Sequence, residues 1–114
     1  MKLSFNKTEL LKGLNISMKA VPSNTTMPLL KCILIDASSS DIRLLSNDME
    51  LAVETIVNGT IYEAGSIALD AKILYEIIRR LPDEEVKISV NERLVANIVC
   101  GKAQYNIPGQ DPSE

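Results

Sequence analysis

The segment LSFNKTELLKGL, residues 3–14, is repeated in kind by IALDAKILYEII, residues 67–78. When the two segments are aligned, apolar residues fall on apolar residues and Asn6 falls on Asp70. Asn and Asp are favoured N-cap residues because their side chains accept hydrogen bonds from the free N–H groups of a helix's first turn. Each copy therefore predicts a short strand that leads directly into a helix, and the chain predicts a domain of two similar halves.

Two amphipathic helices are expected, over residues 7–20 and 71–81, with Pro22 and Pro82 just beyond their ends. Proline is common where a helix stops, because it cannot continue the backbone hydrogen-bond ladder. Apolar residues recur at helical spacing on both segments and form one stripe on each. The stripes consist of Leu10, Leu14 and Met18, and of Ile73, Leu74, Ile77, Ile78 and Leu81. We expect equivalent positions of the two stripes to meet in the core.

Three strand-like runs follow each helix, separated by Ser, Asp, Asn and similar turn residues. The runs cover residues 31–37, 41–46 and 51–57 in the first half, and 85–90, 93–99 and 103–107 in the second. The plan is thus βαβββ, twice. It predicts an α+β fold with pseudo-twofold symmetry, in which two helices lie on one face of antiparallel sheets and some outer strands remain open edges.

Composition sets the outer limits. A chain of 114 residues with 46% hydrophobic content suits a single domain with its own core. No apolar run is long enough to cross a membrane and no signal peptide is recognisable, so the expected location is the cytoplasm. Cys32 and Cys100 lie in strand-like apolar runs, where buried free thiols are expected rather than a disulfide or a metal site.

Charge is distributed unevenly along the chain. The predicted helices carry Lys7, Lys12 and Lys19 against Glu9, and Lys72, Arg79 and Arg80 against Glu76. Each helix has a net charge of +2, which leaves −7 on the other residues of a chain whose net charge is −3. A basic surface on an acidic chain suits the phosphate backbone of a nucleic acid, which Lys and Arg bind without reading sequence. Ordinary solvated charges on exposed helix faces are the alternative, and the charges alone leave both interpretations open.

Five segments in order and spacing carry a resemblance that covers the whole chain. They are MKLSFNKTELLKGL (1–14), NTTMPLLKCILIDA (24–37), SNDMELAVE (46–54), ALDAKILYEIIRRLP (68–82) and CGKAQYNIPGQDP (100–112). Together they closely resemble the first domain of the bacterial DNA polymerase III beta subunit family, the sliding clamps.

This resemblance implies a function and a set of partners. Members of the family are rings of two chains, each with three similarly folded domains, that encircle duplex DNA and tether the polymerase. Residues 1–114 would be the N-terminal domain, with helices lining the hole and sheets forming the outer wall. The expected partners are duplex DNA, bound without sequence preference, a second clamp subunit, the polymerase III alpha subunit and the clamp loader, and no membrane. The pocket for polymerase and clamp-loader peptides would lie in later domains, and neither catalysis nor a cofactor or metal is expected.

Charge pattern and resemblance together indicate DNA-binding residues on the helices and on the loop that follows the first helix. They are Lys12, Lys19, Asn24, Thr25, Lys72, Arg79 and Arg80. Lys72 and Arg79 match basic positions of the family. The loop SNTTMP matches one that touches DNA in the family, but Asn24 stands where some members have Arg, so polar contacts would replace a charge.

The resemblance also implies a subunit interface. Its expected residues are Ile73, Ile77, Lys102, Gln104, Tyr105 and Ile107. The last four match an edge strand that pairs with the third domain of the partner subunit, and Tyr105 and Ile107 are expected to be exposed in this domain by itself. Gln104 replaces a charge that some members have, so fewer ion pairs are expected here.

Two other classes of function were weighed. A metal-dependent nuclease would need carboxylates such as Asp48 and Glu50 or the run PDEE, residues 82–85. These groups are predicted to lie in turns, and the chain has no His and no pattern of an activated nucleophile, which argues against an active site. The other alternative is a stand-alone α+β interaction module that adds an exposed strand edge to a partner's sheet.

Overall fold

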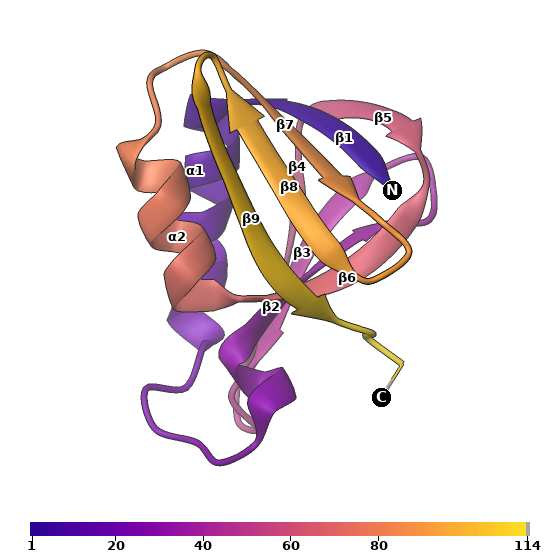
Figure 1. Cartoon of the computed structure of the whole chain (residues 1–114). Helices are drawn as coiled ribbons and strands as arrows, with labels where there is room; N and C mark the ends of the chain where they lie inside the picture. The colour runs from indigo at the N-terminus through magenta and orange to yellow at the C-terminus, as the bar shows by residue number, and fades with distance from the viewer. Residues whose placement is uncertain (114) are drawn as a thin grey trace.

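A computed structural model describes residues 1–113, and its elements follow the predicted order twice (Figure 1). The first half consists of β1 (Lys2–Asn6), α1 (Lys7–Ser17), the 3₁₀ turns η1 (Met18–Ala20) and η2 (Pro28–Lys31), β2 (Cys32–Ala37), β3 (Ile42–Asn47), β4 (Ala52–Val57) and β5 (Gly59–Glu63). The second consists of β6 (Gly65–Asp70), α2 (Ala71–Arg80), β7 (Glu85–Val90), β8 (Val95–Cys100) and β9 (Ala103–Gln110). The α+β prediction is confirmed.

Both helices begin at the predicted capping residues. The Asn6 side chain accepts hydrogen bonds from the N–H groups of Thr8 and Glu9, and Asp70 accepts one from Ile73. The first helix is α-helical only to Ser17 and ends in one 3₁₀ turn. The second ends at Arg80, one residue earlier than predicted, because Leu81 is extended ahead of proline.

The strands form one antiparallel sheet in the order β4-β3-β2-β6-β9-β8-β7-β1-β5. Within this sheet the first strand of each half pairs with a strand of the other half: β1 pairs with β7 of the second half, and β6 pairs with β2 of the first. The pairing therefore has the predicted pseudo-twofold relation. It also means that neither half has a complete sheet without the other.

The strand β5 was not predicted, and it shows how each half is closed. After Val57 the chain passes through a single residue and leaves β3 to pair with β1. In the second half, β9 makes the same crossing without a break: it pairs with β8 up to Pro108, and Gly109 and Gln110 then pair with β6. Each half thus ends on a strand that crosses to the half's own first strand.

Both helices cover the same face of the sheet, and the core lies between (Figure 1). Leu10, Leu14, Leu74 and Ile78 are fully buried in a single cluster, as expected for equivalent positions of the two stripes. Ile73 departs from its predicted stripe, because 48% of it is exposed. The two cysteines are buried free thiols, in agreement with the prediction. Neither helix in the described residues is long and apolar enough to cross a bilayer.

Candidate nucleic-acid interface

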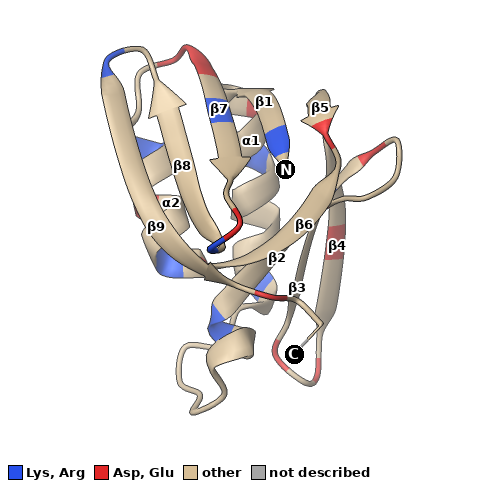
Figure 2. Ribbon diagram, turned by 45° about the vertical axis from the view of Figure 1, so that its right-hand side comes forward, with Lys and Arg blue, Asp and Glu red and all other residues tan. Residues whose placement is uncertain are grey.

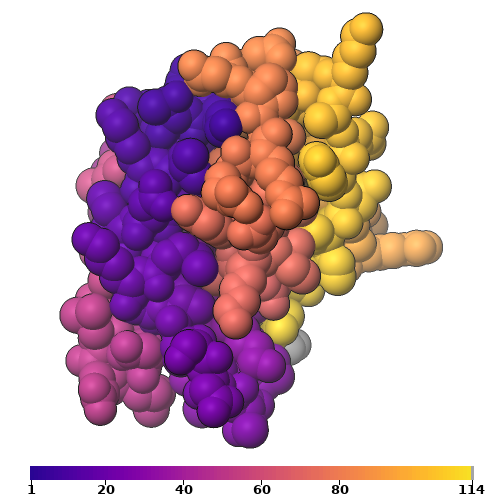
Figure 3. Space-filling model, turned by 90° about the vertical axis from the view of Figure 1, so that its left-hand side faces the viewer, coloured from indigo at the N-terminus to yellow at the C-terminus, as the bar shows by residue number. Residues whose placement is uncertain are grey.

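The two helices lie side by side and antiparallel on one exposed face of the molecule. The Nζ of Lys7, at the start of α1, donates to the carbonyl oxygen of Arg79 near the end of α2, at 3.2 Å. Close by, the Thr8 hydroxyl donates to the Asp83 carboxylate at 3.0 Å. Figure 3 views this face directly, with α1 in indigo to violet beside α2 in salmon to orange. A long, straight ligand would therefore meet both helices at once.

The predicted basic residues of the helices are all exposed on this helical layer. Figure 2 shows where the charges lie: blue positions occur on both helices and also on β1, on β7 and at turns, and red positions occur on β4, on β5 and at several turns. Glu9 and Glu76 are the carboxylates of the two helices. The members of this basic set are Lys12, Lys19, Lys72, Arg79 and Arg80. Because all five side chains are exposed, each is accessible to a phosphate.

Local carboxylates hold part of this basic set in place. Glu76 accepts a hydrogen bond from Arg79 at 2.7 Å and lies 3.3 Å from Arg80, and Glu9 lies 3.8 Å from Lys12. The hydrogen bond from Arg79 lowers the pKa of the Glu76 carboxyl and raises that of the guanidinium, so both groups stay charged. Exposed pairs of this kind contribute little to stability. They can open at small cost when a stronger anion approaches.

The loop after α1 lies at the opposite end of α2 from Arg79 and Arg80. Asn24 and Thr25 line a hollow together with Lys72, in the first turn of α2. The Thr25 hydroxyl oxygen also accepts the N–H of Met27, which shapes the loop. The structure thus brings three predicted DNA-binding residues together from two distant segments. It adds Lys31, which the sequence reasoning missed because a lysine in a short turn has no periodicity to mark it.

The strand β9 has the open edge expected of an interface strand. Residues Ala103 to Pro108 pair with β8 on one side, whereas only Gly109 and Gln110 pair with β6 on the other. Tyr105 is 39% exposed, and Lys102 and Gln104 are exposed as well. In Figures 1 and 3 the β9 edge lies beside α2. This helix carries the exposed Ile73.

Two of the predicted interface residues are positioned differently. The expectation that Ile107 is exposed was wrong, since only 7% of it is accessible. It lies opposite Ala96, which is fully buried, where β9 begins its crossing over the core. Ile77 is 9% exposed and belongs to the same core cluster. Both residues belong to the core, whereas Ile73 and Tyr105 are exposed on the surface.

The carboxylates considered for metal chemistry have structural roles. Asp48 accepts the backbone N–H groups of Glu50 and Leu51, which shapes the turn before β4 and lowers the pKa of its carboxyl. Glu85 accepts a hydrogen bond from the Ser4 hydroxyl across the β1–β7 pair. Within residues 1–113, no group of three or more His, Cys, Asp or Glu side chains is arranged to hold a metal ion.

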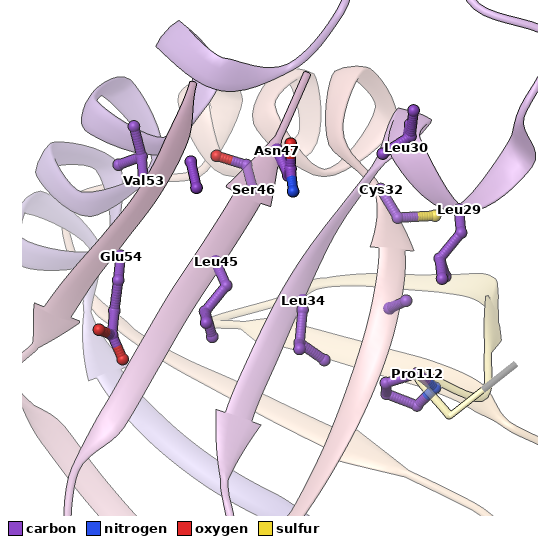
Figure 4. Close-up of a pocket in the computed structure, with 12 residues that line it drawn as sticks. Leu29, Leu30, Cys32, Leu34, Leu45, Ser46, Asn47, Val53, Glu54 and Pro112 are labelled. Carbon is purple, nitrogen blue, oxygen red and sulfur yellow. The ribbon is translucent and has the colours of Figure 1, made fainter. Parts of the chain in front are cut away.

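An apolar groove of about 590 Å³ lies on the other side of the sheet, away from the helices. Figure 4 shows Leu34 and Leu45, which face each other across β2 and β3, directed into the same space as Leu29 and Pro112. Among the described residues, Glu54 is the one charged residue in this lining. The groove therefore offers no cation to a phosphate and is separate from the basic helical face.

The fold and this charged helical layer define a class of protein: a pseudo-symmetric α+β domain of the DNA-clamp type. The family model described as "DNA polymerase III beta subunit, N-terminal domain" matches residues 1–114. The chain belongs to this family.

Individual relatives agree. A beta sliding clamp of Staphylococcus epidermidis is 34% identical over the whole chain, which covers 32% of that protein. A crystal structure of a protein from Eubacterium rectale, named for the DNA polymerase III beta subunit, has a TM-score of 0.97 and 55% identity, over 99% of this chain and 31% of that one. The DNA polymerase sliding clamp from Bacillus subtilis has a TM-score of 0.94 and 33% identity, over 100% and 32%. The chain thus spans about a third of the length of these relatives.

Proposed function

We propose that this chain serves as the N-terminal domain of a ring-shaped processivity factor that encircles duplex DNA and tethers the replicative polymerase. One observation carries the proposal: the two antiparallel helices and the η1 turn place every basic residue of the predicted DNA-binding set on one exposed layer. Glu9 and Glu76 are the carboxylates of these helices, and the other acidic residues among those described lie on strands and turns. A basic inner face would attract phosphates while an acidic outer wall would repel them.

Contact with DNA in this proposal is electrostatic and independent of sequence. Lys and Arg act on phosphates by releasing counterions, which carries no base information. Bases are read mainly by Arg, Asn and Gln side chains. Such side chains are few here: α1 carries Asn15, and α2 carries Arg79 and Arg80, which are adjacent and share Glu76. Weak contacts suit a ring, which retains DNA by enclosure and must still slide.

Assembly would use the open edge of β9. In this proposal Lys102, Gln104 and Tyr105 pair with the third domain of a second clamp subunit, and Ile73 of α2 joins them from the side. The later domains of the longer protein would supply the peptide pocket for the polymerase III alpha subunit and the clamp loader. The domain itself would be non-catalytic, would need no cofactor and would work in the cytoplasm.

The proposal is tested by reversing charge on the helices. The double variant Lys72→Glu, Arg79→Glu should weaken duplex binding equally for all sequences, and in the full-length protein it should impair loading onto primed DNA while the subunits remain dimeric. Fluorescence anisotropy and a loading assay measure the two effects. The matched control is Lys87→Glu, Arg93→Glu, which makes the same change in charge on exposed residues of β7 and of the turn that follows it. Equal losses in both double variants would contradict the proposal, because they would reflect net charge alone.

A stand-alone interaction module is the second candidate, and the open edge of β9 favours it. Such a module would pair with its partner through β9 but would have no need of a basic helical face. Strong binding of a protein partner with no effect of the helix charge reversal would support the module over the clamp.

A further inference from the structure

A hollow of about 250 Å³ lies at the end of the helix pair where α2 begins. It is formed by three segments that are distant in sequence: the loop after α1, the end of η2 and the first turn of α2. The residues that matter are Ser23, Asn24, Thr25, Lys31, Asp70 and Lys72. Two ammonium groups, an amide and two hydroxyl groups therefore line one concave site.

Lys31 and Lys72 differ from three other cations of the helical layer. Lys12, Arg79 and Arg80 each have a carboxylate on their own helix within 4.0 Å, whereas among the residues described Lys31 and Lys72 have none, and Lys19, which does not line the hollow, has none either. Among the described residues of the lining, Asp70 supplies the only carboxylate, and its Oδ1 accepts the N–H of Ile73. The hollow keeps a net positive charge, and its lysines have no ion pair to give up when an anion binds.

The shape and chemistry fit one phosphate group of a polynucleotide backbone. A water molecule occupies about 30 Å³, so the hollow has room for a phosphate group and part of its water shell. The lining contains no aromatic side chain on which a base could stack. A base or a nucleoside would gain little here, whereas two ammonium groups and the polar loop suit a phosphodiester.

We propose that this hollow is a phosphodiester-binding subsite for duplex DNA, in which Lys31 acts together with Lys72. The inference rests on the proposed function, because only a duplex lying along the helices would reach the hollow. It adds a residue outside the helices to the DNA path. It also explains how the loop can contribute although Asn24 carries no charge: the charge comes from Lys31, seven residues later in the chain.

The test is the salt dependence of binding to a short fluorescent duplex by the 114-residue chain, which has its own core. Each phosphate contact contributes about −0.9 to the slope of log K against log salt concentration. Because Lys31 and Lys72 share one phosphate in this inference, Lys31→Gln should weaken binding and make the slope less steep, by at most about 0.9. The matched control Lys87→Gln removes another exposed lysine, from the outer face of β7, and should leave the slope unchanged.

The outcomes separate this inference from the proposed function. An unchanged slope for Lys31→Gln, with a reduced slope for Lys72→Glu, Arg79→Glu, would overturn the subsite and leave the clamp proposal standing. Unchanged slopes for both variants would overturn the two together. Saturable binding of inorganic phosphate at the Asn24 and Lys72 amides, followed by NMR, without any change in the duplex slope of Lys31→Gln, would assign the hollow to a free anion and overturn its assignment to DNA.

Discussion

Leu74 of α2 and its counterpart Leu10 of α1 show how single residues connect the two halves. Both are fully buried, and both follow their capping residue by four positions. The caps set where each helix begins, and the beginning sets which face of the helix meets the sheet. A local hydrogen bond at Asn6 or Asp70 thereby decides which side chains reach the core.

Truncation of Leu74 tests this placement. Leu74→Ala removes a fully buried side chain from a close-packed cluster and should lower the free energy of unfolding by about 2–5 kcal/mol. Equilibrium denaturation measures the change, and Lys72→Ala on the exposed face of the same helix is the control. A loss below about 1 kcal/mol would mean that Leu74 does not lie in the core.

At the scale of elements, the strands that cross back to the first strand of each half depend on two glycines. A Cβ on Gly59, at the start of β5, would lie 2.6 Å from the carbonyl oxygen of Ser4. A Cβ on Gly109, near the end of β9, would lie 2.7 Å from the Ile67 side chain. The two positions are equivalent in the two halves, since Gly59 pairs with Phe5 and Gly109 with Leu69. Each crossing strand passes too close to its neighbour for a larger residue.

This close approach gives a second stability prediction. Gly59→Ala should cost about 1–3 kcal/mol, because the new methyl group meets backbone rather than a flexible side chain. Thermal or chemical denaturation checks it, with the exposed Ser66→Ala on β6 as the control. A variant as stable as the parent would show that the β4–β5 crossing can relax.

The open edge of β9 is expected to matter for the association of two subunits rather than for the folding of one. Tyr105→Asp places a charge on the strand proposed to close the ring, so the full-length protein should change from dimer to monomer in analytical ultracentrifugation. Tyr62→Asp, an exposed tyrosine on β5, is the control and should leave the dimer intact. A dimer that persists at micromolar concentration in Tyr105→Asp would rule out this edge as the interface.

For the whole molecule, the arrangement of charge matters more than the net charge of −3. The segment formed by α1 and η1 has a net charge of +2, as has α2, and the two are packed side by side, so a chain that is acidic overall has one basic layer. Such a layer can bind a polyanion only at short range, because charges beyond about 10 Å are screened at 0.1 M salt. The domain by itself should therefore be a weak binder of DNA.

The salt dependence makes this quantitative. If Lys12, Lys72, Arg79 and Arg80 engage three or four phosphates, the slope of log K against log salt concentration should be about −3 to −4. Anisotropy titrations over a range of salt concentrations measure it on duplexes of unrelated sequence. Nanomolar, sequence-selective binding by the 114 residues alone would contradict a clamp, because it would need base readout.

The sequence by itself determined the features that are local or periodic. Capping residues and apolar spacing predicted both helices, their first residues and their buried stripes apart from Ile73, because a helix's start and its buried face depend on neighbours within a few positions. The resemblance over the whole chain predicted the family. The sequence also predicted the basic surface of the helices, because the basic residues of a short amphipathic helix lie away from its apolar stripe.

Only the tertiary structure decided what depends on strands meeting across the chain. It showed that β4 continues as β5 onto β1, that β9 covers the core at Ile107 but not at Tyr105, and that Lys31 lies beside Lys72. The alternation along a strand tells which face a side chain takes, but not how far over the core the strand extends. Likewise, no periodicity relates a turn residue to a helix forty positions away, so the polar hollow had no signal in the sequence.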